Sequence, residues 1–239
     1  MRLIEFVRGN QVQKAYFNWS SGKDSALALY YAIRSERYSI ETLFSAVTSD
    51  CEKVSMHEVG VDLLKRQAEA IGIPLTIFSF DPLWTKTEYE NAMSEQVREW
   101  KEQGFHTALF GDIYLERQRK NRTHQCEKAG IAAEFPLWNI PTEEVIRAFI
   151  QLGFKAIVTC VDNAVLPESW LGKMIDEDFL GALPANADIC GENGEYHSFV
   201  FDGPIFRHPT VFGIKRKFCR DYPDLITGEP HRYWYLELE

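Results

Sequence analysis

The segment Ser20–Ser25 (SSGKDS) combines residue types that bind phosphate groups. Small Ser and Gly residues allow a tight turn that brings several backbone N–H groups toward one anion, and Ser hydroxyls donate further hydrogen bonds. Lys23 supplies a mobile cation for phosphate oxygens. Asp24 is a carboxylate within an anion-binding turn, which indicates a bound Mg²⁺ that neutralises the phosphates. The segment therefore predicts a site for ATP and magnesium.

This turn differs from the GxxxxGK[ST] nucleotide loop of kinases and GTPases. Phe17 stands at the position of the first Gly, and Asp24 follows the lysine. The alternative interpretation is a capped helix start, with Ser20 or Ser21 as the N-cap residue and Asp24 favouring the helix dipole. Its place directly after the first expected strand favours phosphate binding.

A second segment whose side chains could take part in a reaction lies near the end of the chain. Two carboxylates, Glu192 and Glu195, flank the tight-turn dipeptide Asn193-Gly194. Strand alternation beyond the turn predicts one face made of Glu195, His197 and Phe199. Acids and an imidazole so placed could bind an amine, orient ammonia or carry a proton. The alternative is a hairpin whose turn is flanked by solvated acids.

The elements that position these segments alternate between strands and helices. Strands are expected at 15–19, 43–48, 75–80, 107–110 and 156–160, and helices at 24–35, 57–71, 88–103, 115–129 and 142–152. Thr142 is the expected N-cap of the last helix. Such alternation predicts an α/β fold with a mainly parallel sheet and helices on both faces. Ligands of these sheets bind beyond the carboxyl ends of the strands, where Ser20–Ser25, Ser49 and Asp112 stand.

The composition changes near Pro136, after which most of the prolines and glycines occur. We therefore expect an ATP-binding α/β domain over 1–135 and a smaller α+β domain on the acceptor side over 136–239. The smaller domain is expected to include antiparallel strands at 196–201 and 233–238. The strand at 156–160 is expected to return to the first sheet, and the first 14 residues to form an edge hairpin.

The charge and cysteine content exclude several classes of protein. With 26 basic and 35 acidic residues the net charge is −9, which disfavours a broad nucleic-acid surface, although Arg117–Arg122 could form a local basic patch or a solvated helix face. The five cysteines include no CxxC pair, and their scattered spacing is typical of reduced cytosolic thiols. The early charge at Glu5 argues against a signal peptide, and no membrane helix is expected. The sequence thus predicts a cytoplasmic protein.

The segment SSGKDS resembles the pyrophosphate loop (PP-loop) of the adenine-nucleotide α-hydrolase superfamily, usually written SGGxDS. Ser21 replaces the first Gly of that pattern. The resemblance implies a five-stranded parallel sheet of PP-loop type. It also implies cleavage of ATP to AMP and pyrophosphate during adenylation of a carboxylate, amide or carbonyl oxygen.

SSGKDS and the later GENGEYHSFVFDGP together resemble the diphthine–ammonia ligase family of PP-loop ATP pyrophosphatases. Three further segments agree, Ser55–His57, Gly111–Ile113 and Pro136–Trp138, so the resemblance covers about residues 15–205. Enzymes of that family adenylate a carboxylate on a modified histidine of a translation elongation factor, and ammonia then displaces AMP to form an amide.

The resemblance also implies roles for individual residues. The phosphates and Mg²⁺ would be held by Ser20, Ser21, Gly22, Lys23, Asp24 and Ser25, with Asp24 as the metal ligand. Backbone around Val47 and Ser49 would contact adenine, and Asp112 would lie in the cleft. The expected catalytic residues are Lys23, Asp24, Glu192, Glu195 and His197.

The chain departs from the usual family pattern GEGGEFET at Asn193, His197 and Ser198, which resembles a bacterial branch of the family. A His in place of a carboxylate changes the local charge and proton-donor capacity. The acceptor therefore stays open between diphthine and another carboxylate, and the nitrogen donor between ammonia and an amine. Two other functions remain open, a PP-loop enzyme that modifies tRNA and an ATP-binding module without turnover. A homodimer is compatible with the sequence.

Overall fold

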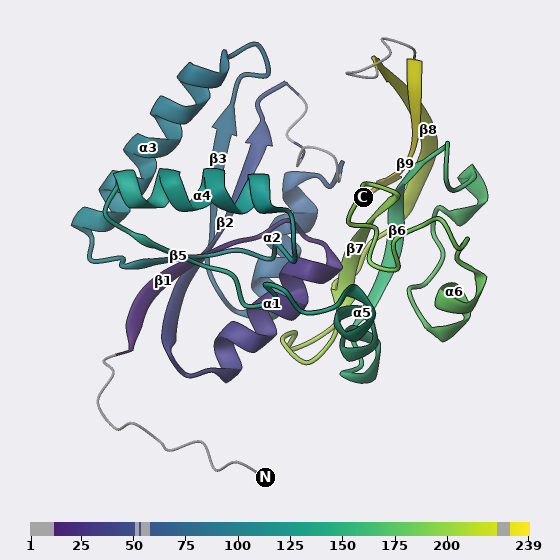
Figure 1. Ribbon diagram of the computed structural model, residues 1–239, viewed down its shortest axis with the longest axis horizontal. Helices are drawn as coiled ribbons and strands as arrows, with labels where there is room; N and C mark the ends of the chain where they lie inside the picture. Colours follow the sequence, from purple (N-terminus) through teal and green to yellow (C-terminus); the bar gives the residue numbers. More distant parts are fainter. Residues whose placement is uncertain (1–11, 51–52, 54–57, 224–229) are drawn as a thin grey trace.

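The computed structural model describes residues 12–50, 53, 58–223 and 230–239 (Figure 1). The hairpin expected at the N-terminus lies mostly outside these residues, as do Cys51, the helix start expected at His57 and the segment Ser55–His57. No helix in the described part of the chain is long and apolar enough to cross a bilayer.

The N-terminal half forms the predicted five-stranded parallel sheet, in the order β3-β2-β1-β4-β5. Its strands are β1 (Gln13–Asn18), β2 (Tyr38–Thr48), β3 (Leu75–Phe80), β4 (Thr107–Leu109) and β5 (Ala132–Glu134). The direction of the connections reverses between β1 and β4, so the crevice at their carboxyl ends is the expected ligand-binding position.

The prediction that 156–160 supplies the fifth strand of this sheet is wrong. That segment forms β6 (Lys155–Asp162), which lies in a second, antiparallel sheet, and the fifth place is taken by β5. All residues of β6 except the first are buried, and a continuous apolar run does not distinguish a parallel from a central antiparallel strand. β5 has only three residues, of which Ala132 is exposed, so no apolar run marks it.

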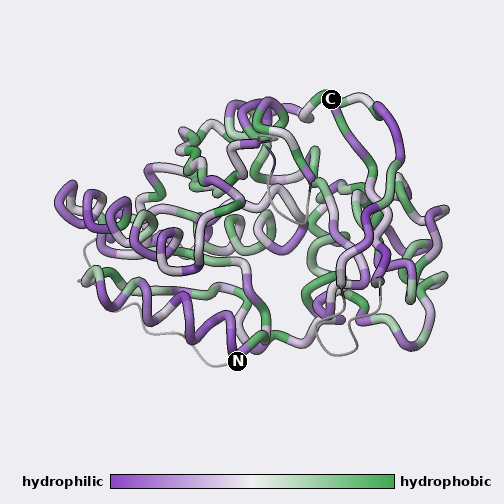
Figure 2. The backbone as a smooth tube through the Cα atoms, turned by 90° about the horizontal axis from the view of Figure 1, so that it is seen from above, coloured by the Kyte–Doolittle hydropathy of each residue, from purple (hydrophilic) through white to green (hydrophobic). Residues whose placement is uncertain are grey.

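Helices cover both faces of the parallel sheet, as predicted. α1 (Lys23–Arg34) and α2 (Val61–Ile71) pack on the face that carries Ala15 and Phe17 of β1. α3 (Lys86–Glu102) and α4 (Glu116–Lys128) pack on the face that carries Tyr16. Figure 2 shows that these outer two helices, at the left, are hydrophilic over much of their length.

The second sheet has the order β7-β6-β9-β8 and belongs to the smaller α+β part of the chain. Its other strands are β7 (Tyr196–Asp202), β8 (Ile214–Pro223) and β9 (Pro230–Leu238), so both antiparallel strands that were predicted are confirmed. The helices of this part are α5 (Thr142–Gln151), the 3₁₀ turn η1 (Glu168–Trp170) and α6 (Glu177–Ala182). In Figure 1, α1 and α2 lie between the two sheets.

The start of α5 differs from the prediction. Pro141 is the N-cap residue, and the side chain of Thr142 makes no capping hydrogen bond. The Thr142 hydroxyl instead donates to Asp188 Oδ2 at 3.0 Å. Thr142 therefore ties α5 to the loop before β7.

The two sheets share one core and a cluster of ion pairs. Buried residues of α1, α2, β6 and β7 belong to the same apolar cluster. Near its rim, Glu58 in the loop before α2 pairs with Lys53 and with Arg220 of β8. Lys53 also pairs with Glu237 of β9 at 3.0 Å, and Glu237 pairs with Arg216 at 2.6 Å. These contacts fasten the connection between β2 and α2 to the β8–β9 hairpin.

Candidate active site

The segment Ser20–Ser25 forms a tight turn between β1 and α1. Ser21 has a φ of +72°, in the left-handed region, and Gly22 is the N-cap of the helix. The Ser20 hydroxyl donates to Ser25 Oγ at 3.1 Å, and the Ser25 hydroxyl donates to the Gly22 carbonyl at 3.0 Å. A left-handed residue before a helix start directs successive N–H groups toward one point, which suits an anion.

Strand β7 of the other sheet holds this turn in place. Val200 N–H donates to the Ser21 carbonyl at 2.9 Å, and Lys23 N–H donates to Ser198 Oγ at 3.1 Å. Gln67 of α2 is fully buried and donates to the carbonyls of Ser21 and Val200. The conformation of the turn at Ser20–Ser25 therefore depends on both sheets.

Lys23 and Asp24 form the charged centre of the site. The Lys23 ammonium lies 2.8 Å from Asp24 Oδ2 and 3.0 Å from Oδ1, and 5.1 Å from the centre of the Tyr196 ring. The side chain of Lys23 is 4% exposed and that of Asp24 is 26% exposed. Burial lowers the pKa of Lys23, but Asp24 and then Tyr196 raise it more, so this pKa stands well above its usual value.

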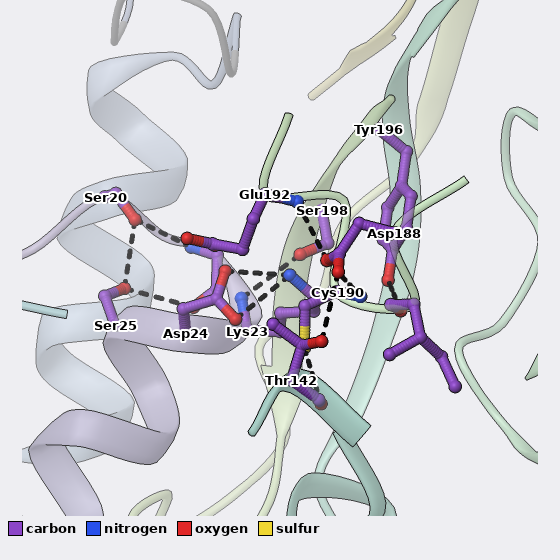
Figure 3. A network of polar contacts seen from close by, with 12 residues as sticks. Ser20, Lys23, Asp24, Ser25, Thr142, Asp188, Cys190, Glu192, Tyr196 and Ser198 are labelled. Carbon is purple, nitrogen blue, oxygen red and sulfur yellow. Dashed lines mark hydrogen bonds and ion pairs between the residues drawn. The ribbon is translucent and has the colours of Figure 1, made fainter. Parts of the chain in front are cut away.

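Glu192 reaches toward this pair from the loop before β7 (Figure 3). Its pKa is raised to about 8, first by burial and then by the charge of Asp24, against the opposing effect of Lys23. A carboxyl that changes protonation near neutral pH can accept or donate a proton during a reaction. Glu192, which the resemblance implies to be a catalytic residue, thus lies close to the Lys23–Asp24 pair.

Glu195 has a different environment from the one expected. It lies before β7 rather than on it, and its buried carboxylate accepts hydrogen bonds from the backbone N–H groups of Asp188 and Asn193 at 2.8 and 2.9 Å. Asp188 in turn accepts from the N–H groups of Cys190 and Glu192. Glu195 therefore shapes the loop that carries Glu192, and Asn193-Gly194 turns the chain inside this loop rather than in a hairpin.

His197 does not share a face with the residues that hold the turn. Ser198 contacts Lys23, and side chains alternate along a strand, so His197 points to the opposite face of β7. Its backbone is paired with Cys160 of β6. The predicted face of Glu195, His197 and Phe199 is thus not formed, because Glu195 precedes the regular strand.

The end of β2 lies beside the turn and carries Val47 and Ser49. β1 pairs with β2 as far as Phe44, whereas β3 pairs with it as far as Thr48. Val47 is buried, and Ser49 is exposed with its N–H donating to the Phe80 carbonyl at 2.8 Å. β2 therefore extends beyond β1 at the edge where a nucleotide base could meet backbone atoms.

Gly111 and Asp112 follow β4 and face the start of α1. A Cβ on Gly111 would lie 3.0 Å from both Cα and N of Ser25, so this close approach requires glycine. The Asp112 carboxylate lies 3.1 Å from Arg122 Nε of α4. Burial raises the pKa of Asp112, Arg122 lowers it, and Asp24 raises it further. Asp112 is thus near enough to Asp24 for the two carboxylates to interact electrostatically.

Several contributors were not predicted from the sequence. Tyr196 and Ser198 belong to the second motif, and strand alternation away from His197 could have indicated them. Gln67 and Asp188 belong to no recognised motif. Their roles come from contacts made in the folded structure, which the sequence around them does not indicate. Tyr114 is a further example, since its hydroxyl lies 3.3 Å from Asn193 Oδ1 across the crevice.

A preformed metal cluster of protein side chains is not part of this site. Within the described ranges, no three His, Cys, Asp or Glu side chains are grouped so as to hold a metal ion. The four described cysteines, Cys126, Cys160, Cys190 and Cys219, are free thiols. A cation at Asp24 would therefore share its coordination with oxygen atoms of a bound substrate.

Comparison with known families agrees with this geometry. The diphthamide synthase N-terminal domain matches residues 13–133, and the diphthamide synthase C-terminal domain matches residues 141–222. This chain belongs to the diphthamide synthase family. The two matched segments correspond to the turn-bearing sheet and to the part that supplies β7.

Characterised relatives are distant in sequence. Diphthine–ammonia ligase of Mus musculus is 27% identical over 80% of this chain and 80% of its own length, and that of Homo sapiens is 25% identical over the same shares. The Bos taurus enzyme is 28% identical over 71% of this chain and 66% of its own length. Among solved structures, the U34-tRNA thiolase NcsA from Methanococcus maripaludis with its [4Fe-4S] cluster is 16% identical over 59% of this chain and 57% of its own, with a TM-score of 0.38.

Proposed function

We propose that this protein is an ATP-dependent ligase that adenylates an acceptor carboxylate, releases pyrophosphate and then forms an amide with ammonia or an amine. The observation that carries the proposal is the turn at Ser20–Ser25, in which a left-handed Ser21 precedes a helix start and a buried Lys23–Asp24 pair. The names of the family's characterised members, diphthine–ammonia ligases, support the same reaction class.

The residues of the turn suit ATP and Mg²⁺. The phosphates would be held by Ser20, Ser21, Gly22, Lys23 and Ser25 through backbone N–H groups, hydroxyls and the ammonium. Asp24 would hold Mg²⁺ together with phosphate oxygens, because it is partly exposed and lies at the helix start. The metal would supply charge neutralisation at the phosphates.

The nucleotide base would lie at the end of β2, beside Val47 and Ser49, where β2 extends past β1. Asp112 would border the ribose or phosphate side of the crevice between β1 and β4. In this arrangement residues 1–135 bind the nucleotide, and residues 136–239 supply Glu192 and the strand that holds the turn.

The reaction would proceed in two steps. A carboxylate oxygen of the acceptor attacks the α-phosphorus, the bond to the bridging oxygen breaks, and pyrophosphate leaves with its charge stabilised by Lys23 and the N–H groups of the turn. Ammonia or an amine then attacks the acyl carbon, AMP leaves with the bonding electrons, and a proton passes from the nitrogen to Glu192. The raised pKa of Glu192, about 8, suits this proton transfer near neutral pH.

The residue roles at Glu195 and His197 are revised in this proposal. Glu195 holds the loop that presents Glu192, because its carboxylate is already bonded to the loop backbone. His197 points to the face of β7 away from the turn, so it has no role in the proposed reaction. The acceptor can be diphthine or another carboxylate, since this chain differs from the usual motif at Asn193 and His197. A homodimer remains a proposal that sedimentation can test.

Product analysis tests the proposal directly. The protein is incubated with ATP, Mg²⁺, ammonium and a mixture of cellular metabolites and proteins, and nucleotides are separated. We expect AMP and pyrophosphate in equal amounts, with the rate reduced at least about 100-fold in Asp24→Asn. Formation of ADP would overturn the reaction class. ATP binding without cleavage would favour a non-catalytic module, and salt-sensitive tRNA binding would favour a tRNA-modifying enzyme.

A further inference from the structure

Strand β8 (Ile214–Pro223) is an outer strand of the second sheet. Within the described ranges β9 is the one strand that pairs with it, so the N–H and C=O groups along its other side have no strand beside them. In Figure 1 the β8–β9 hairpin extends past the other two strands of this sheet. A long edge strand with open backbone groups is a template for pairing with another chain.

The faces of β8 are open as well as its edge. Cys219 is exposed, Phe218 is half-buried, and Tyr222 is 38% exposed. The pairing with β9 shifts register between Ile214 and Arg216 and is regular from Arg216 onward. This regular part is longer than a typical strand of about five or six residues. It can therefore accept a further strand over its whole length.

The charges of β8 restrict which strand it can accept. The strand carries the bases Lys215, Arg216, Lys217 and Arg220 and the acid Asp221, whereas the whole chain has a net charge of −9. Two copies of an acidic protein therefore repel each other less when they approach through this basic strand. Two basic strands still repel at short range unless their register places unlike groups opposite each other.

Symmetry leaves few registers for the pairing of β8 with its own copy. A two-fold axis normal to the sheet places one residue opposite its copy, because opposite residues must point to the same face. Registers centred on Arg216, Lys217, Arg220 or Asp221 bring that charge against itself. The register centred on Phe218 brings Arg216 against Arg220 twice. Like charges directly opposite are unfavourable, so these five registers are disfavoured.

The register centred on Cys219 opposes no like charges. It places Lys217 opposite Asp221 of the second copy, which gives two pairs of opposite charge by symmetry. It also places Phe218 opposite Arg220, so that each guanidinium meets an aromatic ring. Arg220 already lies 5.5 Å from the centre of the Phe218 ring in its own strand. All these residues belong to the regular part of β8.

We infer that β8 pairs antiparallel with β8 of a second copy of this protein, in the register centred on Cys219. The two four-stranded sheets then form one continuous sheet across the dimer. Asp221 is already paired with Arg232 at 2.7 Å, and its carboxylate has further lone pairs for Lys217 of the second copy. The inference concerns assembly and does not depend on the proposed reaction.

Sedimentation equilibrium of the full-length protein tests the dimer. One pair of strands is a small interface, so we expect a reversible equilibrium with a dissociation constant on the order of 10–100 μM. Lys217→Glu should weaken it at least about tenfold, because both Lys–Asp pairs become pairs of like charge. Lys65→Glu, at an exposed position of α2, changes the net charge equally and should alter the constant less than about twofold.

Two results of this experiment would overturn the inference. One is a monomer at every concentration up to about 1 mM, at which β8 would have to serve another kind of partner or none. The other is equal weakening by Lys217→Glu and Lys65→Glu, which would assign the effect to net charge rather than to this strand.

Cysteine cross-linking tests the register. In a Cys51→Ser background, dissolved oxygen with copper–phenanthroline takes two electrons from two thiols, and two protons leave as the disulfide forms. We expect Cys219 to link to its copy, because Cα atoms of directly opposite residues lie roughly 4.5–5.5 Å apart, within the range for a disulfide. The other described cysteines are buried.

Shifted cysteines provide the matched comparison. With Cys219→Ser added, Lys217→Cys alone and Asp221→Cys alone should stay unlinked, since each would lie about 14 Å along the strand from its own copy. A mixture of these two variants should link. Linkage of Lys217→Cys to itself as fast as that of Cys219 would overturn the register. Linkage of Cys219 no faster than that of Lys65→Cys, a site away from β8, would overturn the strand pairing.

Discussion

Ser21 occupies a backbone conformation that glycine adopts at lower cost. Its φ is +72°, and its buried hydroxyl oxygen makes no hydrogen bond within the described residues. The left-handed region costs an L-residue roughly 1–2 kcal/mol, and an unpaired buried hydroxyl costs about 1 kcal/mol or more. The position where the common PP-loop pattern has Gly is thus a strained one in this protein.

We therefore expect Ser21→Gly to raise the free energy of unfolding by on the order of 1 kcal/mol. The relief of strain is larger than this, but glycine also increases the conformational entropy of the unfolded chain, which offsets part of the gain. Urea unfolding at pH 7 measures this change. Ser20→Gly is the matched control and should lower stability, because it removes the hydrogen bond to Ser25. A loss of stability in Ser21→Gly would show that the hydroxyl has a favourable role.

Glu192 should make stability depend on pH. Burial and Asp24 raise its pKa from 4.5 to about 8, so the native state favours the protonated carboxyl. The resulting stabilisation is complete below pH 4.5 and is lost as the pH rises toward 8. Glu192→Gln cannot ionise, so it should become more stable than the wild type as the pH rises, by up to a few kcal/mol at pH 9.

Urea unfolding at several pH values between 4.5 and 9 checks this prediction. Glu127→Gln, at an exposed position of α4, should follow the wild-type curve. A Glu192→Gln curve parallel to that of the wild type over the whole range would contradict the raised pKa.

At the residue scale, the sequence predicted the groups whose roles are local. Lys23 and Asp24 follow one another in a turn whose residue types favour an anion site, and the structure pairs their side chains at 2.8 Å. The start of β7 was expected correctly at Tyr196, but Glu195 was placed on its face with His197, whereas Glu195 precedes the strand and its carboxylate binds the backbone of the loop. Gln67 could not be predicted, because its three partners are Trp19 directly after β1, Ser21 in the turn and Val200 in β7.

Among the elements, the packing of β4 against α1 depends on Gly111. Gly111→Ala would place a methyl group 3.0 Å from Ser25 backbone atoms and 3.2 Å from the Asp24 carbonyl carbon, so the start of α1 must shift. We expect a stability loss of about 1–3 kcal/mol and a loss of ATP affinity of at least about tenfold, measured by calorimetry with a non-hydrolysable analogue.

Gly181→Ala in α6 is the matched control, because its Cβ would meet nothing within 4 Å. It should leave ATP affinity unchanged and slightly raise stability. Wild-type ATP affinity in Gly111→Ala would show that the turn tolerates movement of the helix start.

Most helices and strands could be predicted, because their apolar residues recur with a clear helical or strand period or because Gly and Pro mark their ends. Helices α3, α4 and α5 were expected within two residues of their observed bounds. The assignment of β6 to the wrong sheet has a physical cause, since burial on both faces removes the alternation that would indicate an antiparallel strand. β8 was not predicted, because its charged residues, among them Lys215, Arg216, Lys217 and Arg220, obscure its strand pattern.

For the whole molecule, the ion cluster around Glu58 should couple the two sheets energetically. Glu58 is 7% exposed and pairs with both Lys53 and Arg220. A double-mutant cycle of Glu58→Gln and Arg220→Met should give a coupling energy of about 1–3 kcal/mol. The exposed pair Lys86–Glu90 of α3 is the control and should give at most about 0.5 kcal/mol. Equal coupling in the two pairs would contradict a joining role for Glu58.

The hydrogen bonds from β7 to Ser21 and Lys23 have a consequence for biosynthesis. A ribosome releases the SSGKDS turn early, but the partners of that turn at Ser198 and Val200 emerge some 175 residues later. Until then the nascent polypeptide holds an incomplete nucleotide site. We therefore expect ATP cleavage to begin only after nearly the whole chain has been translated.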